Sequence, residues 1–376
     1  MLLLSNGHIV TALSLFVLIQ SALADEPIES LQHWTAAAPM LQPRSESGVV
    51  LLEDGKVLVF GSHSIGDGPV ASAELYDPMT DHWTAAGALN TPRNGIFQSA
   101  VLLRNGRVLL AGEHSGNKVV AGAEIYDPAT DKWTPTGAMN AGRGGHTLTL
   151  LKTGQVLAAG GMNWETESVI ATAEIYDPRT GRWTGTAPMS QHRFSHRAVL
   201  LSDGRTLVTG GRDAWKGQVL ASAEIYDPKT GKWQSTADMN VARRNHEAVV
   251  LASGKVLVMG GAESPVTELY DPQTESWTPT HPMRETRIAF TATLLDNGGV
   301  LVVGGAIPDG GWRDRATAEY YDPETESWKA AGELSPPRRW HRAVKLSTGD
   351  ILVIGGITLR RYLSRVERFH TTMPEK

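Results

Sequence analysis

The sequence contains no cysteine. The chain therefore has no disulfides, no thiolate nucleophile and no cysteine-ligated metal site. It also has no block of Lys or Arg, and its formal charge of −5 is mild, which argues against a nucleic-acid partner. The G-x-S-x-G, P-loop, H-E-x-x-H and EF-hand motifs are absent as well. What remains is a globular composition whose apolar core must stabilise the chain without covalent cross-links.

Long apolar runs are also missing, except for one near the N-terminus. Residues 9–19 (IVTALSLFVLI) are apolar, and small residues follow at Ala22 and Ala24 before an acidic, proline-containing segment. This pattern predicts a secretory signal peptide over residues 1–24 that is cleaved near Ala24. The alternative is an uncleaved anchor, although the run is short for a membrane span. We expect residues 25–376 to be an exported single domain, in the bacterial periplasm or secreted, with no membrane span.

Three motifs recur in the same order at intervals of about 50 residues. They are a glycine pair or near-pair, a Tyr-Asp-Pro tripeptide and a tryptophan. The glycine pairs end at Gly61, Gly112, Gly161, Gly211, Gly261, Gly305 and Gly356. The tripeptides begin at Tyr76, Tyr126, Tyr176, Tyr226, Tyr270 and Tyr321. The tryptophans are Trp34, Trp83, Trp133, Trp183, Trp233, Trp277 and Trp328.

Each unit divides into four strand-like segments. In the unit that begins at Arg193, residues 196–201 are the first strand, and Asp203-Gly204 is a tight turn into the second. A variable loop follows the glycine pair, residues 221–227 are the third strand, and Trp233 lies on the fourth. A four-stranded unit of this size cannot bury both faces alone, so the units are expected to pack on one another.

These motifs at this spacing resemble the kelch repeat, over residues of about 30–370. The resemblance implies an all-β fold of four-stranded blades with the first strand innermost. The last unit stops after a third strand at Phe369, whereas Trp34 has no unit before it. We therefore expect a seven-bladed β-propeller whose last blade is closed by the N-terminal strand, which removes exposed sheet edges.

Two charged positions carry the same residue in every unit. They are occupied by Arg44, Arg93, Arg143, Arg193, Arg243, Arg287 and Arg338, and by Glu74, Glu124, Glu174, Glu224, Glu268, Glu319 and Glu367. One interpretation is structural, because buried charges need partners and the two sets recur together. The other places the arginines at the mouth of the channel, as in the animal kelch adaptors that bind acidic peptides. The ligand-binding candidates of this set are Arg143, Arg193, Arg243 and Arg338.

Residues that differ between the units point to a binding site, since a site breaks the symmetry of the repeat. Four units have a histidine three residues after the arginine: His146, His196, His246 and His341. These imidazoles either contact a ligand, bind a metal or bond the next blade. Four tryptophans lie outside the repeat: Trp164, Trp215, Trp312 and Trp340. They are expected on one face, where they either cap their own loops or contact a sugar ring or a partner side chain.

The leading hypothesis is a non-enzymatic binding module for a saccharide or protein ligand, on the face that carries the loops between strands two and three. The alternative is a carbohydrate-active enzyme of the epimerase or lyase type that uses Arg, His or Glu at the channel mouth. The copper-radical chemistry of galactose oxidase, another kelch propeller, is excluded because its cofactor requires a cysteine. We assign no metal or cofactor and expect a monomer. A deep pocket with a Glu or Asp beside His or Arg would favour the enzyme.

Overall fold

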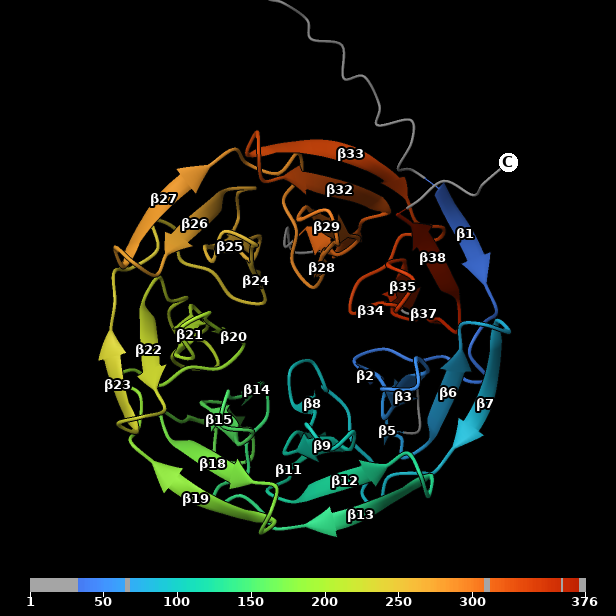
Figure 1. The fold of residues 1–376 in the computed structure, drawn as a ribbon, viewed down its shortest axis with the longest axis horizontal. Coiled ribbons are helices and arrows are strands. Elements are labelled where there is room, and N and C mark those ends of the chain that lie inside the picture. The colour runs from blue at the N-terminus through green and yellow to red at the C-terminus, as the bar shows by residue number, and fades with distance from the viewer. Residues whose placement is uncertain (1–32, 65–67, 308–311, 360, 372–376) are drawn as a thin grey trace, which may run out of the picture.

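The computed structural model describes residues 33–64, 68–307, 312–359 and 361–371. Seven four-stranded antiparallel sheets stand as blades around a central axis, and the described residues include no helix (Figure 1). In particular, no helix in this part of the chain is long and apolar enough to cross a membrane. The predicted all-β fold with seven blades is confirmed. The predicted signal peptide lies outside the described residues.

The first four blades follow in chain order, each given from its innermost to its outermost strand. Blade 1 has β2 (Gly48–Leu51), β3 (Val57–Phe60), β6 (Ala73–Asp77) and β7 (His82–Ala86). Blade 2 has β8 (Ala100–Leu102), β9 (Val108–Ala111), β12 (Ala123–Asp127) and β13 (Lys132–Thr136). Blade 3 has β14 (Thr147–Leu150), β15 (Val156–Ala159), β18 (Ala173–Asp177) and β19 (Arg182–Thr186). Blade 4 has β20 (Arg197–Leu200), β21 (Thr206–Thr209), β22 (Ala223–Asp227) and β23 (Lys232–Ser235).

The last three blades complete the ring. Blade 5 has β24 (Glu247–Val250), β25 (Val256–Met259), β26 (Thr267–Asp271) and β27 (Ser276–Thr280). Blade 6 has β28 (Thr291–Leu294), β29 (Val300–Val303), β32 (Thr317–Asp322) and β33 (Ser327–Glu333). Blade 7 has β34 (Arg342–Lys345), β35 (Ile351–Ile354), β38 (Val366–His370) and β1 (His33–Ala37).

Five blades carry a small hairpin between their second and third strands. The hairpins are β4 (His63–Ser64) with β5 (Gly68–Pro69), β10 (His114–Ser115) with β11 (Lys118–Val119), β16 (Met162–Asn163) with β17 (Ser168–Val169), β30 (Ala306–Ile307) with β31 (Arg313–Asp314), and β36 (Ile357–Thr358) with β37 (Arg361–Tyr362). In blade 5 the corresponding loop, residues 262–266, is short and has no hairpin. The rim of the propeller is therefore uneven on the side that bears these loops.

Blade 7 is built from both ends of the described chain. Strand β1 pairs antiparallel with β38, with Trp34 opposite Phe369, and the two lie side by side in Figure 1. The two rings are 5.1 Å apart, and Trp34 Nε1 donates a 2.8 Å hydrogen bond to the Ala331 carbonyl of blade 6. The predicted closure by the N-terminal strand is confirmed.

The apolar core lies between neighbouring blades. The second strand of each blade is fully buried, and it is a continuous apolar run in every blade except blade 4, where β21 has a threonine at each end. Leu257 and Met259 of blade 5 share one cluster with Val300, Val302 and Trp328 of blade 6. Each blade therefore depends on the next for burial of its apolar face, as a repeat architecture requires.

The glycine pair lets the linker of one blade cross the next at close range. Gly160 and Gly161 have φ of +63° and +110°. A Cβ at Gly160 would lie 2.5 Å from the Arg193 carbonyl oxygen, and a Cβ at Gly161 would lie 2.9 Å from Arg143 Cβ. Only glycine meets both the backbone and the space requirement without strain.

The repeated arginines and glutamates pair within each blade. Arg143 donates to the Gly160 and Thr172 carbonyls at 2.9 and 2.8 Å and to Glu174 at 2.7 Å. Glu174 also accepts the backbone N–H of Asn140, in the linker that enters the blade. The seven pairs are Arg44–Glu74, Arg93–Glu124, Arg143–Glu174, Arg193–Glu224, Arg243–Glu268, Arg287–Glu319 and Arg338–Glu367. All seven arginines are at most 1% exposed, so these pairs hold the linkers to the blades.

Candidate functional site

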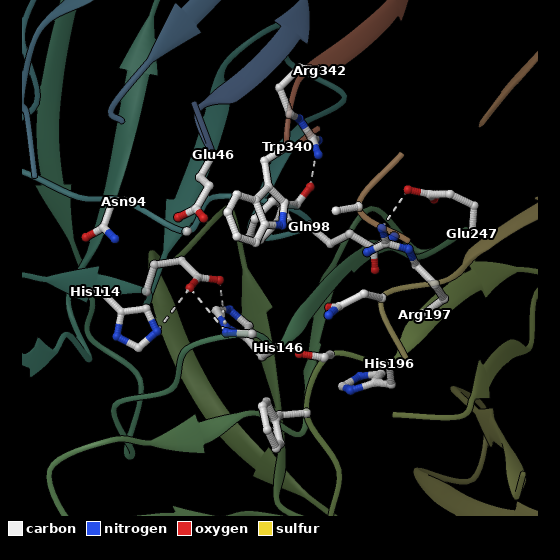
Figure 2. Close-up of a pocket in the computed structure, with 18 of the residues that line it drawn as sticks. Glu46, Asn94, Gln98, His114, His146, His196, Arg197, Glu247, Trp340 and Arg342 are labelled. Carbon is white, nitrogen blue, oxygen red and sulfur yellow. Dashed lines mark hydrogen bonds and ion pairs between the residues drawn. The ribbon is translucent and has the colours of Figure 1, made fainter. Parts of the chain in front are cut away.

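A pocket of about 280 Å³ lies on the propeller axis, at the channel mouth where the linkers enter the blades. Its lining residues come from all seven blades. Figure 2 shows that carboxylates, imidazoles, guanidinium groups and the Trp340 indole surround the same space. The pocket is therefore made by the ring as a whole and by no single repeat.

Each blade contributes to the pocket lining the residue two positions after the repeated arginine. These residues are Glu46, Gly95, Gly145, Ser195, Asn245, Ala289 and Trp340. All seven have positive φ, and all seven line the pocket. Backbone N–H groups bond from blade to blade along this ring, as from Asn245 to the Ser195 carbonyl at 3.0 Å. The repeat thus holds one backbone position per blade at the axis, while the side chain there varies.

Three of the four repeated histidines bond the preceding blade. The Nε2 atoms of His196, His246 and His341 lie 3.2, 2.8 and 3.0 Å from threonine hydroxyls. Those hydroxyls belong to Thr147, Thr209 and Thr291. Burial lowers the pKa of all three imidazoles well below its ordinary value, so they are neutral. His196 and His341 also line the pocket, whereas His246 does not.

His146 differs, because it lies beside Glu113 instead of a threonine hydroxyl. Its Nδ1 is 3.5 Å from Glu113 Oε1, and both side chains are buried. Glu113 Oε2 accepts the Gly145 N–H at 3.2 Å. Burial raises the pKa of the Glu113 carboxyl to about 8, and the Gly145 hydrogen bond offsets only part of this effect. The pocket therefore contains a buried carboxyl that exchanges its proton near neutral pH.

Glu113 occupies a backbone position that is suited to glycine. It follows Gly112, where blades 3 to 7 carry the second glycine of the pair, and its φ is +71°. A non-glycine residue in this conformation is strained, and such strain gathers at functional sites. Glu113 is not among the residues predicted from the sequence. The signal in the sequence is that Glu113 replaces the second glycine of an otherwise regular pair.

A second carboxyl, that of Glu46, lines the same pocket. It is the axial residue of blade 1, with φ of +55°. Burial raises its pKa to about 7, although Arg339 acts in the opposite direction. The like charge of Glu46 also contributes to raising the pKa of Glu113.

Aromatic rings form another part of the wall. Trp164 packs edge-on against Trp215 at 4.3 Å and against Phe194 at 5.8 Å. The Trp164 indole N–H donates to His114 Nε2, and burial lowers the pKa of His114 to about 4. Trp340 lines the pocket from blade 7. The predicted Trp164, Trp215 and Trp340 thus lie together at the pocket.

Trp312 is exposed and does not line the pocket. Its ring is 5.0 Å from that of Trp340, and the Arg339 guanidinium lies over both rings at 5.0 and 4.9 Å. Arg339 also pairs with Asp314. Trp312 therefore supports the position of Trp340.

Charged residues occupy the first position of three innermost strands, below the axial ring. Arg197 pairs with Glu247 at 2.6 Å, and Arg342 Nη2 donates to the Phe97 carbonyl at 2.6 Å. Burial lowers the pKa of Arg342 to about 10, with Glu247 acting against this and Arg197 adding to it. All three side chains line the pocket (Figure 2). The sequence analysis did not select them, because the first strand was interpreted only as structure.

The predicted ligand-binding arginines lie elsewhere. Arg143, Arg193, Arg243 and Arg338 do not line the pocket, and each is buried against its glutamate and backbone carbonyls. Of the two interpretations of the repeated arginines, the structural one agrees with the structure and the placement at the channel mouth is wrong, because their guanidinium groups pair inside the blades. Within the described ranges, no group of three or more His, Cys, Asp or Glu residues is arranged to hold a metal ion.

The structure is a closed propeller with a pocket on its axis. Comparison with known proteins shows similarity to kelch-repeat proteins. A family model described as the Kelch motif matches residues 152–190 and 193–240. Two F-box/kelch-repeat proteins of Arabidopsis thaliana are each 34% identical to this chain, over 85 and 77 residues. Beta-scruin of Limulus polyphemus is 29% identical over 82 residues. The chain is a kelch-repeat β-propeller.

These matches are short. They cover 23%, 20% and 22% of this chain and 22%, 21% and 8% of the three relatives. Among solved structures, a fungal alcohol oxidase of the AA5 family, in complex with copper, is similar with a TM-score of 0.75 and 18% identity. That match covers 91% of this chain and 76% of the oxidase chain. At this identity the similarity to the oxidase shows the fold alone. The kelch β-propeller fold is compatible with a binding module.

Proposed function

We propose that this propeller binds a small saccharide in its axial pocket. The proposal rests on one observation: aromatic rings and buried polar groups line the same cavity. Trp164, Trp215 and Trp340 offer faces on which a sugar ring packs, while Glu113 and Arg342 offer hydrogen bonds to its hydroxyls. A site of this composition is suited to a ligand that is apolar on its faces and polar at its edges.

The size of the cavity favours a small ligand over a protein partner. Its volume of about 280 Å³ is close to the lower end of the range for small-molecule sites, roughly 300–1,000 Å³. A folded partner does not enter such a space. Trp215 is 45% exposed, so its ring is available to a ligand at the mouth.

A glycan-array screen of residues 25–376, followed by calorimetry with the best monosaccharide, tests the proposal. We expect Trp215→Ala to weaken binding at least about tenfold, because stacking area is lost. The matched control is Met79→Ala, which also removes an exposed apolar side chain, 85% exposed, at a residue that does not line the pocket. Unchanged affinity for Trp215→Ala, with an unchanged melting temperature, would overturn the proposal.

A second candidate is an enzyme of the epimerase or lyase type. Glu113 and His146 favour it, because a buried carboxyl with a pKa near neutral, beside an imidazole, is suited to give and take a proton. The test incubates the bound sugar in heavy water and follows exchange of its C–H protons by NMR. Exchange that Glu113→Gln abolishes, and that Glu53→Gln on the surface leaves unchanged, supports catalysis. The absence of exchange with the native protein sinks this candidate.

We propose further that the chain is exported, on the basis of the apolar segment over residues 9–19 and the small residues at Ala22 and Ala24. Expression of residues 1–376 followed by fractionation and N-terminal sequencing tests this. We expect a soluble product that begins just after Ala24. A product that keeps residue 1 and stays in the membrane fraction would contradict cleavage and support an anchor.

A further inference from the structure

The charges at the base of the pocket do not balance. Arg197 and Arg342 both face the channel there, and Glu247 is their carboxylate neighbour. Glu247 forms its ion pair with Arg197, so Arg342 is left with the neutral Phe97 carbonyl as its partner. An uncompensated charge in a partly buried site is costly unless an opposite charge joins it.

The histidines beside these arginines add no positive charge to the pocket. Burial lowers the pKa of His196, His246 and His341, and the positive charges of nearby arginines, both the repeated ones and Arg197 and Arg342, lower it further. These imidazoles therefore stay neutral and add no further positive charge. The arginines remain the cationic groups at the base of the cavity.

The arginines are also accessible from the channel. The Arg197 side chain is 12% exposed, and Arg342 is likewise only partly buried. The seven repeated arginines, in contrast, are almost completely enclosed within their blades. Because Arg197 and Arg342 lie at the first position of β20 and β34, two rigid strands aim them at the same space (Figure 2).

We propose that Arg197 and Arg342 form an anion subsite, and that the ligand is an acidic saccharide whose carboxylate reaches them. This inference rests on the proposed saccharide function and names its substrate class. Arg197 and Arg342 together with the Glu247 carboxylate leave one positive charge, which matches the single charge of a uronic acid better than the nearly double charge of a sugar phosphate. The aromatic residues hold the ring of the same ligand near the mouth.

The test compares a uronic acid with its neutral hexose, for example galacturonate with galactose, by calorimetry. The native protein is expected to prefer galacturonate by at least about tenfold. Arg342→Gln removes the charge, and we expect it to abolish that preference, because galacturonate loses at least about tenfold more affinity than galactose. The control Arg244→Met changes an arginine that does not line the pocket, and it is expected to keep the preference.

The outcomes separate this inference from the proposed function. Equal affinity for galactose and galacturonate would overturn the anion subsite and leave saccharide binding intact. Tighter binding of galactose 6-phosphate than of galacturonate would overturn the choice of a carboxylate. If no sugar binds, the saccharide function fails, and acetate then tests the subsite alone. Acetate must raise the melting temperature of the native protein above its value in chloride at the same concentration. Acetate must leave the melting temperature of Arg342→Gln unchanged. No such rise would overturn the subsite as well.

Discussion

Glu113 Oε1 lies 3.5 Å from His146 Nδ1. Glu113 occupies the repeat position at which blades 3 to 7 carry the second glycine of the glycine pair. Glu113 and His146 are buried and line the axial pocket. Three features of these two residues are unfavourable for stability. Glu113 has a positive φ and a buried carboxyl, and His146 lacks the threonine hydroxyl that His196, His246 and His341 contact. Costs of this kind are retained at functional sites, and they make the pair open to direct test.

The first prediction concerns stability and pH. The folded-state pKa of Glu113 is about 8, above the ordinary value of 4.5, so its stabilising contribution is complete below about pH 4.5 and is lost as pH rises toward 8. Glu46 acts in the same direction. We expect Glu113→Gln to remove about 2–4 kcal/mol of the fall in the free energy of unfolding between pH 5 and pH 9. Urea denaturation at both pH values measures it, with Glu53→Gln as control; equal pH slopes would contradict it.

The second prediction concerns backbone strain at the same residue. At φ of +71°, Glu113→Gly is expected to stabilise the protein by about 1–3 kcal/mol relative to Glu113→Ala, because only glycine relaxes there. Measurement near pH 5 keeps the carboxyl neutral and isolates the backbone effect from the charge effect. A glycine variant no more stable than the alanine variant would show that this conformation stores no strain.

The third prediction concerns the repeated ion pairs. Arg193 and Glu224 are buried and 3.0 Å apart. Arg193→Met or Glu224→Gln alone is expected to cost about 3–5 kcal/mol, because each leaves a buried partner uncompensated. The double variant should cost clearly less than the sum. A double-mutant cycle from urea denaturation measures the coupling, and additive costs would mean that the two side chains act independently.

The fourth prediction concerns ring closure. Trp34→Ala removes the contact with Phe369 and the hydrogen bond to Ala331, and we expect a cost of about 2–4 kcal/mol. Deletion of residues 33–37 should destabilise the whole ring and cause aggregation, because it exposes the edge of β38. Ala36→Ser on the same strand is the control. A deleted protein that keeps its native melting temperature would disprove closure by β1.

The fifth prediction concerns pH and ligand affinity. Galacturonate affinity is expected to fall at least about tenfold between pH 6 and pH 9, because ionised Glu46 and Glu113 repel an anion whereas their protonated forms donate hydrogen bonds. Galactose affinity should change less. Calorimetry at both pH values measures this. The other charged or titratable groups at or near the pocket are Arg93, His114, His146, His196, Arg197, Glu247, Arg339, His341 and Arg342. Equal pH profiles for the two sugars would refute the prediction.

Much of the fold is readable from the repeat. The glycine pairs or near-pairs and the tryptophans of the repeat occur seven times and the Tyr-Asp-Pro turns six times, so their number and order predict the blades. The unpaired Trp34 and the truncated last unit predict the shared blade. These features are local or periodic, and periodicity in the chain becomes symmetry around the axis.

The site was predicted only in part, for a physical reason. Trp164, Trp215 and Trp340 were selected because they break the repeat, and the structure brings them to one pocket. The repeated arginines were selected because of their charge, yet their pairing with glutamate depends on which side of a strand faces the blade. Glu113 was overlooked because its significance lies in a backbone angle.

The sequence by itself therefore determined the number of blades, the order of their strands and the shared last blade, because each rests on a residue pattern that repeats along the chain. Only the tertiary structure decided which side chains meet at the axis. Residues as distant as Glu46, Glu113, Arg197 and Arg342 face one cavity because the closed ring brings the inner ends of different blades to one axis. Their altered pKa values follow from burial, which a linear sequence does not specify.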